Sequence, residues 1–124
     1  VELLDIYPTL VDLLGLPERE DLDGLTLRPL LEDPRATRRP AISTYRPGNH
    51  VALTEKWRYI RYNDGTEELY DRVNDPNDWF NLAGDPQHAE VKRQLARYMP
   101  QSSVPPLPGR DDFEFDFQTY SYGR

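Results

Sequence analysis

A strong hairpin signal, Asn63-Asp64-Gly65, constrains the fold of this chain more than any other feature of its sequence. Asn, Asp and Gly accept the positive φ angles that a tight turn between antiparallel strands requires. The triplet separates two runs of β-forming residues, and two similar runs lie before them on either side of Pro47-Gly48-Asn49. The four runs span residues 41–45, 51–54, 57–62 and 67–70. The sequence therefore predicts a small antiparallel sheet of four strands.

A helix is predicted over residues 86–99, after the sheet. Asp85 precedes a proline and provides the N-cap and first turn that a helix start requires. Val91, Leu95 and Met99 recur at a spacing of four and form one apolar stripe. We expect this stripe to cover one face of the sheet.

The first 34 residues have a different, mostly helical pattern. Val1–Leu4 is short and apolar, which suits the end of a buried strand. A helix is predicted over 5–14, with Asp5 as its N-cap and Gly15 as its stop, and one further helical turn is predicted before Pro34. An exposed apolar patch is expected on the first helix, formed by Leu10, Val11, Leu13 and Leu14.

These patterns divide the chain into three parts, residues 1–34, 35–100 and 101–124, and the fold class is α+β for this piece. Residues 101–112 are rich in Ser, Pro and Gly, which favours an extended tail. Phe113, Phe115 and Phe117 then alternate with acidic residues, which predicts a strand docked at a sheet edge. Because the sequence begins inside an apolar pattern and its only methionine is Met99, we expect a C-terminal piece of a longer protein.

The composition excludes several classes of function. The 124 residues contain 22 acids, 15 bases and no cysteine, which excludes disulfide scaffolds, thiolate zinc sites and a cysteine nucleophile in this chain. A net charge of -7 disfavours nucleic acid as a partner, and no apolar run is long enough to predict a membrane span. Residues 35–62 nevertheless hold seven bases and one acid, which indicates either an anion-facing surface or internal ion pairs. The compartment stays open.

The candidate binding residues are Arg46, Asn49 and His50, at the turn between the first two predicted strands. Arg46 offers a planar fork of donors that fits a sulfate or a carboxylate, and Asn49 adds neutral donors. His50 can donate a hydrogen bond to an anion when protonated, or orient a hydroxyl when neutral. The alternative is a turn that only caps the sheet. The sequence holds no nucleophile elbow, phosphate-binding glycine loop or metal-ligating histidine pair, so no catalytic or metal residue is predicted.

Three strings of residues together resemble the C-terminal part of sulfatases. Residues 1–17 look like their Asp-x-x-Pro-Thr-helix-Gly segment, and residues 22–31 resemble their Leu-Asp-Gly-x-Ser-Leu-x-Pro-Leu-Leu loop. Residues 54–62, 68–71 and 75–78 are similar to their closing hairpin. The likeness is greatest to bacterial enzymes of the iduronate-2-sulfatase or choline-sulfatase type. It implies the terminal strand and helix of a larger α/β domain over 1–34, followed by a small C-terminal sheet and helix.

The resemblance implies hydrolysis of sulfate esters by a formylglycine, made from the Cys or Ser of a Cys/Ser-x-Pro-x-Arg motif, beside a bound calcium ion. The nearest string here begins at Ser103 but has Leu107 in place of the arginine, so none of the family's catalytic residues can be assigned to this chain. We therefore expect a C-terminal sulfatase fragment, inactive alone, that braces the catalytic domain and forms a rim of the substrate pocket. Its expected partners are the rest of that domain and a sulfated small molecule or saccharide.

Two other functions remain open at this point. The parent protein could act on a phosphate monoester or diester, because the residues that discriminate are not in this sequence. The chain could instead be a non-enzymatic domain whose basic strands bind an anionic polysaccharide.

Overall fold

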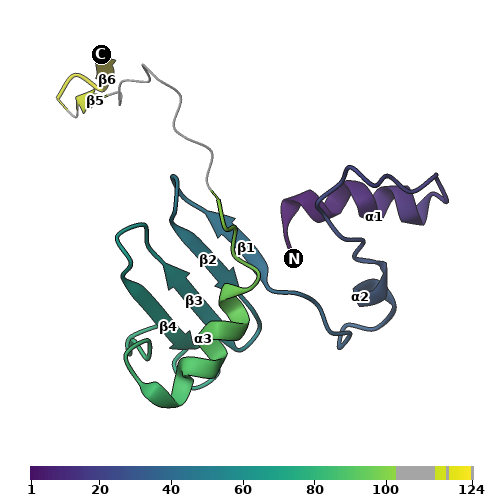
Figure 1. Ribbon diagram of the computed structural model, residues 1–124. Helices are drawn as coiled ribbons and strands as arrows, with labels where there is room; N and C mark the ends of the chain where they lie inside the picture. Colours follow the sequence, from purple (N-terminus) through teal and green to yellow (C-terminus); the bar gives the residue numbers. More distant parts are fainter. Residues whose placement is uncertain (103–113, 117, 124) are drawn as a thin grey trace.

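The computed structural model describes residues 1–102, 114–116 and 118–123. Its main body is a four-stranded sheet with a helix on one face, and a smaller helical segment lies beside the first strand (Figure 1). The α+β class predicted from the sequence is confirmed. No helix in these ranges is both long and apolar enough to cross a lipid bilayer.

The four-stranded sheet is antiparallel throughout, with its strands in chain order. The strands are β1 (Ala41–Thr44), β2 (His50–Leu53), β3 (Trp57–Arg61) and β4 (Glu67–Asp71). Each predicted run forms one strand, with bounds that differ by at most one residue at either end. The hairpin between β3 and β4 closes at Gly65, whose φ of 85° lies in the region that glycine adopts without strain.

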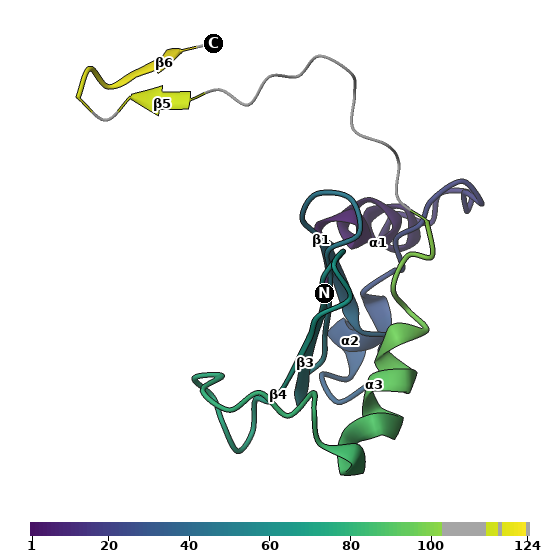
Figure 2. The same ribbon diagram turned by 60° about the vertical axis from the view of Figure 1, so that its left-hand side comes forward.

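The core lies between the sheet and helix α3 (Ala89–Ala96), which runs along one face of the sheet (Figure 2). Its buried residues are Ala52, Tyr59 and Leu69 from the sheet and Leu95 and Met99 from the helical side. Because Ala52, Tyr59 and Leu69 face one another across β2, β3 and β4, they form one row beneath the helix. The expected packing of the C-terminal helix on the sheet is confirmed.

The predicted helix over 86–99 is divided in the structure. It begins with the 3-10 turn η2 (Pro86–His88), where Asp85 accepts a hydrogen bond from the Gln87 amide at 2.9 Å. The α-helical part ends at Ala96, and turns then carry the chain to Met99. Met99 is only 2% exposed, so the apolar stripe extends past the end of the helix.

The N-terminal segment contains η1 (Leu3–Asp5), α1 (Ile6–Leu13) and α2 (Arg28–Glu32). The strand predicted at Val1–Leu4 is wrong. The Asp5 carboxylate accepts a hydrogen bond from the Glu2 amide at 2.6 Å, which closes a helical turn instead.

The expected apolar patch on α1 is present, but its membership differs. Leu10, Leu13 and Leu14 are at least half exposed, whereas Val11 is buried towards the loop before α2. No residue of α1 or α2 belongs to the core cluster under α3. The helix that was expected to lie apart from that core does so.

The outer edge of β4 is covered by the segment that follows it. The Leu82 amide donates to the Leu69 carbonyl at 2.8 Å, and the Leu69 amide donates to Asn81 Oδ1 at 3.0 Å. Asn81 Nδ2 also donates to the carbonyl of Glu67, and the Asp75 amide donates to that of Asp71. The outward carbonyls of Glu67, Leu69 and Asp71 and the outward amide of Leu69 are therefore occupied.

The C-terminal prediction is only partly tested. Residues 103–112, most of the predicted extended tail, and Phe113 and Phe117 lie outside the described residues. Phe115 lies in β5 (Glu114–Asp116), which pairs with β6 (Ser121–Gly123) in a separate two-stranded sheet. The prediction of a strand docked at the edge of the larger sheet is wrong, because β5 finds its partner within the tail.

Candidate functional site

The β1–β2 turn holds its arginine in an unusual backbone conformation. The Tyr45 amide donates to the Asn49 carbonyl at 3.0 Å and closes the turn. Arg46 has a φ of 58°, in the left-handed region that non-glycine residues rarely adopt. Such a conformation costs on the order of 1 kcal/mol and persists only where the surrounding structure imposes it.

Gly48 lets this turn approach the neighbouring hairpin. A Cβ atom at position 48 would lie 2.3 Å from Asn63 Oδ1, too close for any side chain. Asn49 joins the same two turns, because its Oδ1 accepts a hydrogen bond from the Asn63 amide at 3.2 Å and its Nδ2 donates to Pro47 at 3.3 Å. Both polar atoms of the Asn49 side chain therefore form hydrogen bonds that stabilise the turn.

His50, predicted at the turn, lies directly after it, and its side chain is buried. It is the first residue of β2, only 3% exposed, on the sheet face that carries α3. Its Nδ1 lies 2.9 Å from Thr44 Oγ1 across the β1–β2 pair. Burial, and secondarily the charge of Arg61, lower the pKa of His50 below its ordinary value, which favours the neutral imidazole.

The buried imidazole makes stability depend on pH. Below about pH 6.5 the unfolded chain binds a proton at His50 more readily than the folded chain does, so acidification favours unfolding. We expect the free energy of unfolding to fall between pH 6.5 and 5, measured by urea unfolding. His50→Gln should reduce this decrease in the free energy of unfolding. His88→Gln, at the second histidine of the sequence, should leave the contribution of His50 to the decrease unchanged. An unchanged slope in His50→Gln would contradict this account.

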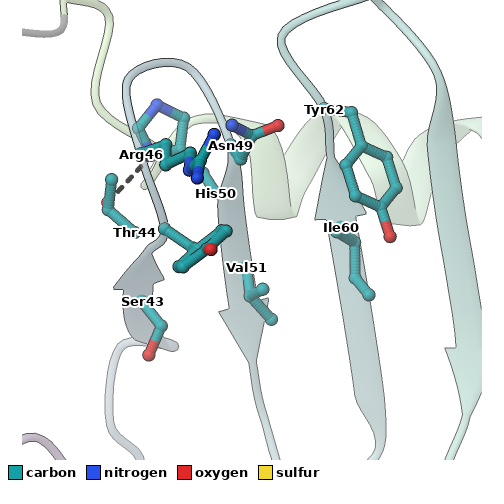
Figure 3. A pocket seen from close by; sticks show the side chains of 9 residues that line it. Ser43, Thr44, Arg46, Asn49, His50, Val51, Ile60 and Tyr62 are labelled. Carbon is teal, nitrogen blue, oxygen red and sulfur yellow. Dashed lines mark hydrogen bonds between the residues drawn. The ribbon is translucent and has the colours of Figure 1, made fainter. Parts of the chain in front are cut away.

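The opposite face of the sheet holds an open hollow of about 620 Å³ beneath the turn. Val51 and Ile60 form its apolar floor on β2 and β3, and Tyr62 stands beside them (Figure 3). The exposed Tyr45 and Arg46 border it, with the Arg46 guanidinium carbon 5.7 Å from the centre of the Tyr45 ring. The hollow thus combines an apolar floor, aromatic sides and a cation, which suits an anionic ligand with an apolar body.

Most of the basic block predicted from the sequence is internally paired. Lys56 lies 3.8 Å from Asp71 across the β3–β4 hairpin, and Arg58 forms an ion pair with Asp78. Arg38 and Arg39 pair with carboxylates near the N-terminus. Arg35, Arg46 and Arg61 form no ion pair within the described residues, and of these three only Arg46 lines the hollow. Internal pairing therefore explains much of the block, and Arg46 is the cation presented at the hollow.

All three candidate residues line the hollow. Arg46 and Asn49 do so from the turn, and His50 does so from the start of β2, with its ring largely buried beside Thr44. Sequence reasoning missed Tyr45, Val51, Ile60 and Tyr62. The register of β1, β2 and β3 places them there, and strand alternation alone gives no signal of which face stays open.

The residues described here do not fit a metal or formylglycine centre. They contain no group of three or more His, Asp or Glu side chains placed to hold a metal ion. The sequence also has no cysteine from which formylglycine could be made. No chemical step is assigned to either group in this chain.

A family model and curated relatives of this chain both belong to the sulfatases. The model of the C-terminal part of N-sulphoglucosamine sulphohydrolase matches residues 1–104. A sulfatase of Formosa agariphila is 36% identical over 105 residues, which cover 84% of this chain and 21% of that relative. The chain thus spans about a fifth of the length of this curated relative.

Solved structures support the same likeness. A protein in complex with its substrate D-glucosamine-2-N,6-O-disulfate superposes with a TM-score of 0.60 at 26% identity, covering 75% of this chain and 22% of the other. The phosphonate monoester hydrolase of Agrobacterium radiobacter gives a TM-score of 0.55 at 31% identity, covering 75% and 23%.

Proposed function

Since the chain belongs to the sulfatase family, we propose that the whole protein hydrolyses a sulfate ester of a saccharide, and that this chain forms one rim of its substrate site. The matched family is named for an N-sulfated amino sugar, and one structural neighbour was solved with a disulfated glucosamine. The observation that carries the proposal for this chain is Arg46, an unpaired cation over an apolar, aromatic-sided hollow.

The proposed roles of the three turn residues differ. Arg46 contacts an anionic group of the saccharide, because its planar fork matches the oxygens of a sulfate or carboxylate. Tyr45 and Tyr62 lie where a sugar ring would stack beside the apolar floor. Asn49 and His50 support the turn through their hydrogen bonds with Asn63 and Thr44.

The proposed partner of the N-terminal segment is the catalytic domain of the same protein. The exposed leucines of α1 form an apolar face that has no cover within the described residues. We assign residues 1–34 to that domain, 35–100 to the C-terminal sheet and helix, and 101–124 to a tail. Calcium and formylglycine belong, in this proposal, to the preceding part of the protein.

Replacement of Arg46 tests the rim. In the full-length protein, Arg46→Ala should lower kcat/KM for a sulfated disaccharide about tenfold to a hundredfold, because one hydrogen-bonded charged contact is lost. Most of the loss should appear in KM. Arg97→Ala, an exposed arginine next to α3, is the matched control and should keep wild-type kinetics.

His50→Ala separates the two kinds of role. We expect it to lower the thermal midpoint, because it leaves a buried space under α3, and to affect KM only through the turn. If Arg46→Ala keeps wild-type kcat/KM on every sulfated saccharide that the enzyme turns over, the turn is structural and the rim is misassigned.

A second candidate function is hydrolysis of a phosphate or phosphonate ester. The likeness to a phosphonate monoester hydrolase favours it, since that enzyme shares this sheet and helix. Parallel assays of the full-length protein with 4-nitrophenyl sulfate and the matching phosphate and phosphonate esters decide between the two. The narrower assignment to an iduronate-2-sulfatase or choline-sulfatase type is tested by adding choline sulfate and a 2-O-sulfated uronate to that panel.

A further inference from the structure

Asp5 binds two segments that are distant in the sequence. Its carboxylate is fully buried; Oδ1 accepts a hydrogen bond from the Leu25 amide at 3.0 Å, and Oδ2 accepts one from the Glu2 amide at 2.6 Å. The Arg38 guanidinium forms an ion pair with the same Oδ2, and the Arg38 side chain is 12% exposed. Burial alone would raise the pKa of Asp5, but the two amide donors and Arg38 outweigh it and lower that pKa, so the carboxylate stays charged.

Glu2 makes the second connection, from the N-terminus to the sheet. Its Oε1 accepts a hydrogen bond from the Ile42 amide in β1 at 3.0 Å. Its Oε2 lies 3.7 Å from Arg39, whose guanidinium also donates to the Asp23 carbonyl at 2.8 Å. Four links therefore join η1 and the 23–25 loop to the residues that lead into β1.

The loop itself is pressed onto η1. A Cβ atom at Gly24 would lie 2.1 Å from the Leu4 carbonyl oxygen, so only glycine fits there. Between Arg39 and β1 there is a single residue, the buried Pro40, and a proline restricts the backbone. The chain from the ion pairs to the strand thus has little freedom to bend.

We propose that Glu2, Asp5, Arg38 and Arg39 form a clasp that fixes the direction of β1 relative to α1, and thereby positions the Arg46 turn. β1 runs directly from the clasp to this turn, with Arg46 two residues beyond its last residue, Thr44. The role in catalysis rests on the proposed function, in which α1 packs on the catalytic domain and Arg46 contacts the substrate. The clasp residues are positioning residues, since they touch neither the hollow nor the proposed ligand.

A distance measurement tests the clasp without any activity. Because the chain has no cysteine, spin labels can be placed at Leu13→Cys on α1 and Glu55→Cys in the β2–β3 turn without removing native thiols. Double electron–electron resonance should give one narrow distance distribution for this labelled pair. Arg38→Ala and Glu2→Ala should each broaden this distribution clearly. Arg93→Ala, which removes an exposed ion pair with Glu90 on α3, should not.

Two variants keep this test decisive. If circular dichroism shows that Arg38→Ala fails to fold, Glu2→Ala decides, because it removes the acceptor of the Ile42 amide while leaving the Asp5 pair in place. Unchanged distance distributions in the folded clasp variants would overturn the proposal.

Kinetics of the full-length protein test the positioning role. Arg38→Ala should raise KM for a sulfated disaccharide about tenfold and leave kcat/KM for a small aryl sulfate within about twofold. Arg38→Lys should restore part of the loss, and Arg38→Ala combined with Arg46→Ala should be no worse than Arg46→Ala alone. Equal losses on both substrates would overturn positioning of the rim. Absence of turnover in the wild type would instead refute the proposed function and leave the distance measurement as the test of the clasp.

Discussion

The isolated 124-residue chain should release no sulfate from an aryl sulfate, whereas the full-length protein proposed above should turn the same substrate over. The chain contains no cysteine, and none of its serines begins a Ser-x-Pro-x-Arg string. Without the family's nucleophile, the rate enhancement of at least about a millionfold that enzymes provide is expected to be absent altogether. Sulfate release is measured with purified chain in the presence of calcium.

A contaminating host sulfatase is the main confounder of that assay. Activity from a contaminant would persist unchanged when the chain carries Arg46→Ala, so this variant is the control. Calcium-dependent turnover that copurifies with the chain and falls in Arg46→Ala would contradict the prediction.

Leu69→Ala should lower the free energy of unfolding by about 2–5 kcal/mol, the range for a leucine removed from a packed core. Leu69 is fully buried in β4, within the cluster that also holds Tyr59 and Leu95. Val73→Ala is the matched control, because Val73 is 65% exposed and should change the free energy by no more than about 0.5 kcal/mol. Urea unfolding followed by tryptophan fluorescence measures both; a loss below about 1 kcal/mol in Leu69→Ala would contradict this assignment of the core.

Local signals predicted the sheet well because they act between neighbouring residues. Asn63-Asp64-Gly65 fixed the β3–β4 hairpin, and the alternation around it fixed the four strands. The face of each side chain was harder to predict. The predicted strand began at Val51 and left His50 in the turn, whereas β2 begins at His50 in the structure. Because successive strand residues point to opposite faces, the His50 side chain shares the buried face of β2 with Ala52.

Interactions over long distances in the sequence could not be predicted. The strand expected at Val1–Leu4 followed from its apolar residues, but the conformation there depends on Asp5 and on contacts with Leu25 and Arg38. The hollow depends likewise on residues of three strands. Of its lining residues, only Arg46, Asn49 and His50 could be selected in advance, because they lie at the turn or directly after it.

The covered edge of β4 has a consequence for polymerisation. Growth of a fibril by strand addition needs two free sheet edges on every subunit, because each subunit must pair with one neighbour on either side. On this chain the segment 75–82 binds the outward carbonyls of Glu67, Leu69 and Asp71 and the outward amide of Leu69. Pairing through the β1 edge would therefore stop at two molecules, and the four-stranded sheet does not propagate into an open-ended assembly.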